Sequence, residues 1–140
     1  MIYSFLQNGD SAVTVQFKNE ISEEVNRRVT GLCNRIEAKH INGIIELVPT
    51  FASLTVFYDC TIISSKKLKK KIKSLINGGE CDVKSTAKVW NIPVCYDDEF
   101  ALDMKNVCSH TALEREEVIK LHTSKPYLIY MLGFLPGFAY

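Results

Sequence analysis

The feature that most constrains the fold is an alternation of paired β-prone runs and helical apolar stripes over residues 1–78. The runs 2–6 and 11–17 are rich in apolar, β-branched and aromatic residues, and Asn8-Gly9 between them favours the positive φ angles of a tight hairpin turn. After Ser22, a plausible N-cap, apolar residues recur at helical spacing. This spacing predicts an amphipathic helix over residues 23–38.

The same order follows a second time along the chain. Residues 44–48 and 53–58 read as strands, with Pro49 in their connection. A second apolar stripe starts at Ser64 or Ser65, and Gly78-Gly79 ends it, in an expected left-handed or flexible conformation. Each element of this ββαββα order has one apolar side to bury, so we expect an α+β domain in which a mainly antiparallel sheet carries both helices on one face.

A second unit is expected to follow a short connection. Residues 79–86 are polar and contain glycine, 88–96 read as a strand, 102–109 and 113–122 as short helices, and 127–132 as a buried strand. The expected organisation is a domain at 1–78, a linker at 79–86 and the start of a second domain at 87–140.

Composition excludes several broad classes. Seventeen basic and sixteen acidic residues give a net charge of +1, so no whole-molecule field attracts nucleic acid or an anionic membrane. No apolar run approaches a membrane span and the N-terminus lacks a signal-peptide pattern, which predicts a soluble, cytoplasmic protein. An odd number of scattered cysteines indicates free thiols in a reducing compartment. They are Cys33, Cys60, Cys81, Cys95 and Cys108.

Lysines are concentrated on the second predicted helix, at positions 66, 67, 69, 70, 71 and 73. They could dock an acidic partner or a phosphate backbone. They also surround an apolar stripe, and no aromatic or arginine is interleaved with them, so a solvated helix face is the preferred interpretation. Nucleic-acid binding is not predicted.

Two other clusters contain residue types that are found in catalytic or metal sites. Cys108 and His110 are two residues apart, so on one helix they point to different faces, and neither a catalytic dyad nor a metal site is expected. The acidic run 97–99 and Asp103 could hold magnesium or form an acid and base pair. Loop solvation and helix capping explain 97–99, whereas Asp103 remains a candidate catalytic residue.

The strongest local signal is the segment from His122 to Tyr140. Its glycines permit positive φ or close backbone approach, its proline fixes φ, and its phenylalanines bring large rings nearby. Such a turn is either a pocket wall, whose glycine amides hold a carboxylate or an oxyanion, or part of a core. The candidate substrate-binding residues are Gly133, Phe134, Pro136, Gly137, Phe138 and Tyr140. His122 is either a catalytic residue or a structural histidine.

Four stretches carry a resemblance to a known family. They are GDSAVTVQF at 9–17, GIIELVPTFASLTVFYD at 43–59, IPVCYDDEFALDM at 92–104, and LEREEVIKLHTSKPYLIYMLGFLPGFAY at 113–140. In order and spacing they are similar to the bacterial family that includes the B subunit of 5-oxoprolinase, allophanate hydrolase subunit 1 and the Kip sensor-kinase inhibitor. The family usually has Gly-Pro before the aspartate that matches Asp103, where this chain has Ala101 and Leu102.

This resemblance implies a fold and a function. The fold is a two-layer α/β domain followed by a cyclophilin-like β-barrel, which we expect to be incomplete in this chain, so that the chain self-associates. The implied activity is ATP-dependent opening of 5-oxoproline to L-glutamate, in a complex with the C subunit as closest partner and with the A subunit. The alternatives are inhibition of a sporulation sensor histidine kinase and binding of a urea-derived substrate.

Overall fold

The computed structural model describes residues 3–78 and 88–140. Within these ranges the chain divides into two compact units. One comprises residues 3–78 with 129–140, and the other comprises residues 88–128. The predicted linker at 79–86 lies outside the described residues, and the predicted domain boundaries stay a prediction.

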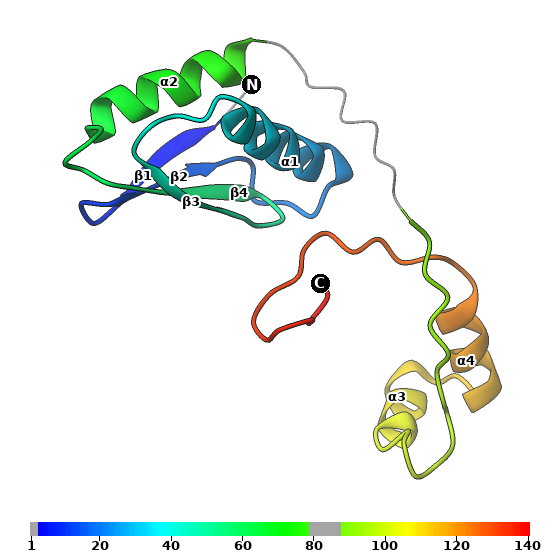
Figure 1. The fold of residues 1–140 in the computed structure, drawn as a ribbon. Helices are drawn as coiled ribbons and strands as arrows, with labels where there is room; N and C mark the ends of the chain where they lie inside the picture. Colours follow the sequence, from blue (N-terminus) through cyan, green and yellow to red (C-terminus); the bar gives the residue numbers. More distant parts are fainter. Residues whose placement is uncertain (1–2, 79–87) are drawn as a thin grey trace. The chain divides into compact units, whose positions relative to one another are not determined.

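The first unit is built on a four-stranded antiparallel sheet with strand order β1-β2-β4-β3 (Figure 1). The strands are β1 (Ser4–Asn8), β2 (Ala12–Gln16), β3 (Ile44–Pro49) and β4 (Ser53–Tyr58). Register places Leu6 opposite Thr14, Thr14 opposite Thr55, and Thr55 opposite Val48. Both predicted hairpins are present, and β2 and β4 form the centre of the sheet.

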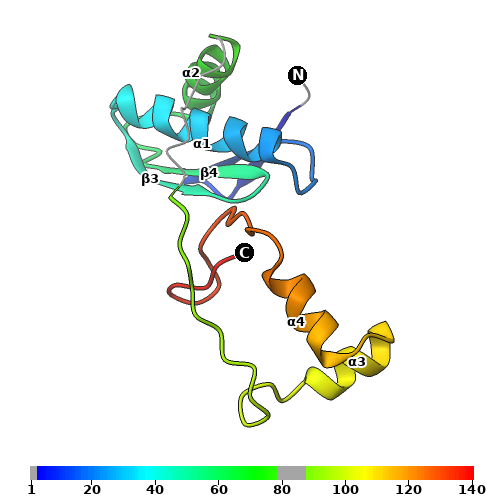
Figure 2. The ribbon, with the colours of Figure 1, turned by 90° about the vertical axis from the view of Figure 1, so that its right-hand side faces the viewer.

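Helices α1 (Glu23–Ala38) and α2 (Ser65–Asn77) cover one face of this sheet, as Figure 2 shows from the side. The spacing of apolar residues explains why, because Leu68, Ile72 and Ile76 of α2 recur every four residues and are all buried. They join Val13, Val15, Val29, Leu32, Ile36, Leu54, Val56 and Tyr58 in one core. The ββαββα prediction is confirmed.

Within residues 3–78, two glycines adopt positive φ where the chain turns. Gly9 has φ +61° after β1, and Gly43 has φ +93° before β3. Gly43 also lies against the segment that leads into α2, since a Cβ on it would be 2.7 Å from Cγ2 of the buried Ile63. Gly78 ends α2 with a φ of −74°, so of the two expected conformations it does not take the left-handed one, and Gly79 lies outside the described residues.

The second unit contains α3 (Met104–Thr111) and α4 (Arg115–Thr123), which lie close to the predicted helical segments. Ala112 takes a left-handed conformation between them, with φ 57°. Glu114 and Glu117 form a reciprocal capping box that fixes the start of α4. The short connection and the capping box together define this helical pair.

The β-prone runs of the later part of the chain behave differently from the prediction. In the described range 88–140, residues 88–96 form no strand, and one isolated bridge joins Leu132 to Ala139. A β-prone run becomes a strand only when another strand supplies its hydrogen-bonding partner. The start of a cyclophilin-like barrel at 87–140 therefore stays a prediction.

Other expectations concern thiols and membranes. Cys33, Cys60, Cys95 and Cys108 are free cysteines, and Cys81 lies outside the described residues. Burial raises the pKa of the Cys33 thiol, with a smaller contribution from Glu37. Across residues 3–78 and 88–140, the helices are too short or too polar to cross a membrane.

Candidate functional site

The glycine- and phenylalanine-rich segment near residue 135 closes into a short hairpin-like turn. The amide of Tyr140 donates to the carbonyl of Met131 at 2.9 Å, and the amide of Met131 donates back to the carbonyl of Tyr140 at 2.9 Å. The amide of Gly133 donates to the carbonyl of Phe138 at 2.8 Å. We call residues 133–138 the aromatic turn. Its two ends are held together by main-chain hydrogen bonds.

Two amides of the aromatic turn make no main-chain hydrogen bond within the described residues. Phe134 and Gly137 both have positive φ, at 62° and 80°. In the described part of the chain, neither of their amides donates to a main-chain acceptor, whereas the amide of Gly133 is occupied. Among the amides of the turn, those of Gly137 and Phe134 could therefore donate to an anion, and anion binding by the glycine amides stays a prediction.

The aromatic rings of the turn contact one another and face solvent. Phe134 lies 6.0 Å from Phe138 and 5.3 Å from Tyr140, measured between ring centroids. The exposed fractions of Phe134 and Phe138 are 87% and 50%. Both phenylalanine side chains are thus exposed in this structure, and the choice between a pocket wall and part of a core stays a prediction.

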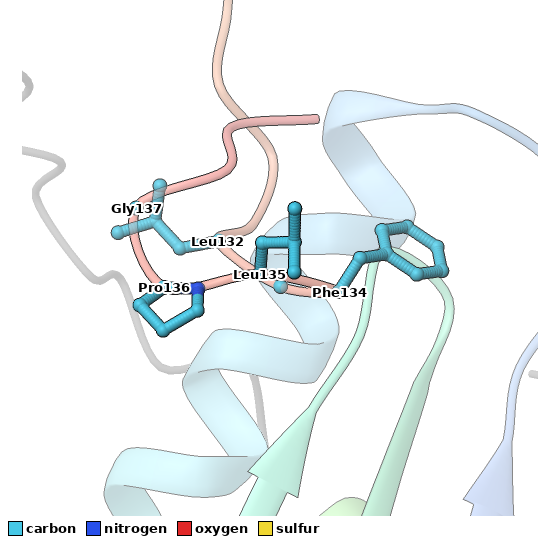
Figure 3. A pocket seen from close by; sticks show the side chains of 6 residues that line it. Leu132, Phe134, Leu135, Pro136 and Gly137 are labelled. Atoms are coloured by element: carbon cyan, nitrogen blue, oxygen red, sulfur yellow. The ribbon is translucent and has the colours of Figure 1, made fainter.

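A shallow hollow of about 350 Å³ lies along the aromatic turn, lined by residues 132–137. In Figure 3, Phe134 and Pro136 lie on opposite sides of Leu135, with Gly137 next to Pro136. Apolar side chains with a few main-chain donors are the usual composition of a small-molecule site. The roles of these residues in binding substrate stay a prediction.

His122 lies on α4 in the second unit, and its side chain is exposed. Its Nδ1 forms a hydrogen bond with the hydroxyl of Tyr96. Its ring also contacts Tyr127, with centroids 5.7 Å apart. With the phenol as donor, Nδ1 accepts, and the neutral ring then carries its proton on Nε2. Tyr96 thus orients the imidazole, and among the described residues no hydrogen bond is made by its Nε2.

Arg115 ties the segment before α3 to α4. Its guanidinium pairs with the carboxylate of Asp98 and donates to the carbonyl of Tyr96. The hydrogen bond from Arg115, assisted by its charge, lowers the pKa of the exposed Asp98 carboxyl, and the same pair raises the pKa of Arg115. Arg115 therefore holds the backbone of the residue whose side chain orients His122.

Sequence reasoning missed Arg115 and Tyr96. They are 19 residues apart, and only the fold brings them together. The one sequence signal for such a contact was the arginine itself, because a guanidinium can donate to two acceptors at once.

Asp103, the other predicted catalytic residue, occupies the N-cap position of α3. Its side chain is exposed and makes no capping hydrogen bond. No hydrogen bond or ion pair among the described residues joins Asp103 to His122. Its catalytic role stays a prediction.

Cys108 and His110 both lie on α3, two residues apart, as the argument against a dyad assumed. In the described ranges no group of three or more potential metal ligands is found.

Comparison with known proteins places the chain in a family. The model of the carboxyltransferase domain, subdomain C and D, matches residues 3–140. The chain belongs to this family. The resemblance read from the four sequence stretches is thereby confirmed.

Individual relatives agree with this assignment. The chain is 39% identical to the B subunit of 5-oxoprolinase from Bacillus subtilis, over 99% of the chain and 62% of that protein. It is similar to the uncharacterized protein PH0987 of Pyrococcus horikoshii, with 37% identity, a TM-score of 0.52, and coverage of 97% of this chain and 62% of that one. It is also similar to TTHA0988, with 32% identity, a TM-score of 0.74, and coverage of 91% and 24%. The chain thus spans less than two thirds of the length of these relatives.

Proposed function

We propose that the chain is part of a 5-oxoprolinase, as its B subunit, and takes part in the ATP-dependent opening of 5-oxoproline to L-glutamate. The observation that carries the proposal is the 39% identity to the Bacillus subtilis protein over 99% of the chain. The partners are the other subunits of the complex, with the C subunit closest and the A subunit in addition. We also propose that residues 87–140 begin a cyclophilin-like β-barrel after a domain at 1–78 and a linker at 79–86.

The aromatic turn suits one end of this substrate. 5-Oxoproline is a small five-membered lactam that carries a carboxylate. The amides of Phe134 and Gly137 offer two donors for that carboxylate, and the exposed ring of Phe134 offers an apolar surface for the lactam ring. In this proposal, Pro136 shapes the hollow, and Phe138 and Tyr140 support the ring of Phe134.

His122 is proposed separately as a proton-transfer residue. Opening a lactam leaves an amine nitrogen that must gain a proton. An imidazole whose Nδ1 is hydrogen-bonded to Tyr96 can donate its Nε2 proton to that nitrogen when Nδ1 is protonated as well, and the neutral ring that remains keeps its proton on Nδ1, directed at the phenol oxygen. Asp103 is proposed as a second group for proton transfer. ATP is assigned to the assembled complex, and none of the described residues is assigned to it.

The test is reconstitution of the full-length protein with its candidate A and C subunits. ATP hydrolysis and glutamate release are measured with and without 5-oxoproline, and each component is omitted in turn. The proposal expects 5-oxoproline to stimulate hydrolysis only when all the subunits are present. A complex that is not stimulated, together with tight binding of the protein to a sensor histidine kinase, would favour the inhibitor alternative instead.

A further inference from the structure

Helix α2 carries a concentrated positive charge on the side away from the core. Lys66, Lys70 and Lys73 follow one another at spacings of four and three residues, so they form one exposed stripe. Lys67 and Lys71 lie on one flank, and the half-buried Lys69 lies on the other. We call these six lysines the lysine face.

The helix that carries the lysine face is anchored to the rest of the first unit. Leu68, Ile72 and Ile76 of the same helix are buried in the core of the first unit. Ser64 caps the helix by accepting a hydrogen bond from the amide of Lys67, and the hydroxyl of Ser65 bonds to Gln7 of β1. Because the apolar side of α2 is fully used inside the protein, any partner must meet the charged side.

The charge of this face is not neutralised within the described part of the chain. None of the ion pairs there involves a lysine of α2, and the first turn of the helix contains no acidic residue. Lys66 and Lys67 lie instead near the helix N-terminus, where the helix dipole disfavours positive charge. The pairs Lys66–Lys70 and Lys67–Lys71 bring like charges together at i,i+4 spacing, which also opposes helix formation. Stability alone therefore does not account for this arrangement.

The lysine face and the remainder of the chain have net charges of opposite sign. Six of the seventeen basic residues lie on α2, and the other eleven are outnumbered by the sixteen acidic residues. The remainder of the chain thus has a net charge of −5, from the same counts. The net charge therefore favours contact of an anionic partner with α2 over the remainder of the chain.

We propose that the lysine face docks the acidic surface of a partner protein, whose carboxylates follow one another about one helical turn apart. Lysine ammonium groups are compact, strongly hydrated point charges that suit separate carboxylates. The face contains no arginine for bidentate phosphate contacts and no aromatic residue for base stacking, so a nucleic acid fits it less well. A membrane also fits less well, because the apolar side of α2 is buried and cannot insert.

The test uses the full-length protein and a labelled synthetic peptide of about 20 residues, long enough to form a helix, with glutamates at i, i+4 and i+7. Binding is followed by fluorescence anisotropy. The test variant combines Lys66→Gln, Lys70→Gln and Lys73→Gln. The control combines Lys18→Gln, Lys39→Gln and Lys120→Gln, which removes the same charge from other exposed sites. Thermal unfolding verifies that both variants fold.

We expect the test variant to bind the peptide about tenfold more weakly than the wild type, the control to bind nearly as tightly, and binding to weaken as salt rises from about 50 to about 300 mM. Equal losses in both variants would overturn the proposal, since only net charge would then matter. Absence of binding would overturn it too, as would tighter binding of duplex DNA or of phosphatidylserine vesicles through the same lysines. A variant that combines Lys66→Arg, Lys70→Arg and Lys73→Arg keeps the charge and should retain binding.

Discussion

The close approach of Gly43 to Ile63 makes a sharp prediction about stability. Alanine at position 43 meets two obstacles at once. The φ of +93° is unfavourable for any residue with a Cβ, and the new Cβ would lie 2.7 Å from Cγ2 of Ile63. Ile63 is only 5% exposed, so its side chain has little room to move. The carbonyl of Gly43 also accepts a hydrogen bond from the amide of Asp59 at 2.8 Å, which restrains the backbone.

The backbone and packing costs together give an expected change in the free energy of unfolding. A left-handed backbone costs an L-residue about 1–2 kcal/mol, and overpacking in a filled core costs about 1–3 kcal/mol. Reduced freedom of the unfolded chain offsets about 0.4–1 kcal/mol. We therefore expect Gly43→Ala to lower the free energy of unfolding by about 2–4 kcal/mol. Gly9→Ala is the matched control, because Gly9 has φ +61° but nothing within 4 Å of its ideal Cβ. Its loss should be about 1 kcal/mol.

Urea unfolding followed by far-ultraviolet circular dichroism measures both variants against the wild type. The difference between the two variants reports the contacts of the new Cβ with Ile62 and Ile63, since both variants carry a positive-φ cost. Equal losses for the two variants, or a larger loss for Gly9→Ala, would refute the packing described for Gly43.

Three further predictions concern the second unit and the state of the chain. In the reconstituted complex, His122→Ala should lower turnover much more than it lowers the melting temperature, and Asp103→Asn is a parallel test. If His122→Ala instead melts the second unit while the folded fraction keeps normal turnover, His122 is a structural residue. Arg115 lowers the pKa of Asp98, so that pKa should rise in Arg115→Gln when it is followed by carboxyl NMR titration. Because the pKa is depressed in the folded state, the pair contributes to folding stability above the ordinary aspartate pKa of about 3.9, and this contribution is lost as pH falls through the folded-state pKa. An unchanged Asp98 titration would contradict the pairing. The exposed apolar residues at 127–129 should cause self-association of the 140-residue chain in light scattering, and a monodisperse monomer whose residues 88–140 resist protease would disprove it.

The ββαββα part of the first unit, residues 3–78, could be predicted from sequence because its signals are local. The spacing of Val25, Val29, Leu32 and Ile36 defines one face of α1 without reference to any distant residue. The approach of Gly43 to Ile63 was beyond reach, because it depends on how the connection after β4 packs over the start of β3.

The candidate site was predictable only in part. Positive φ at Gly137 follows from residue type, whereas positive φ at Phe134 runs against it and is imposed by closure of the aromatic turn. The hydrogen bond between Tyr96 and His122 joins residues 26 apart, and no local pattern specifies such a pairing. The run at 88–96 illustrates the opposite failure, since β-propensity without a pairing partner left it outside any strand.

The central claim, that the aromatic turn holds the carboxylate of 5-oxoproline, can be tested at the amide of Gly137. The full-length protein is labelled with nitrogen-15 at glycine, assembled with its partner subunits, and titrated with 5-oxoproline. Gly9 serves as the internal reference, because it has a similar positive φ but lies in the turn between β1 and β2. We predict that the Gly137 amide resonance shifts with substrate while that of Gly9 does not. A Gly137 resonance that stays fixed in a complex whose ATP hydrolysis responds to 5-oxoproline would contradict the claim.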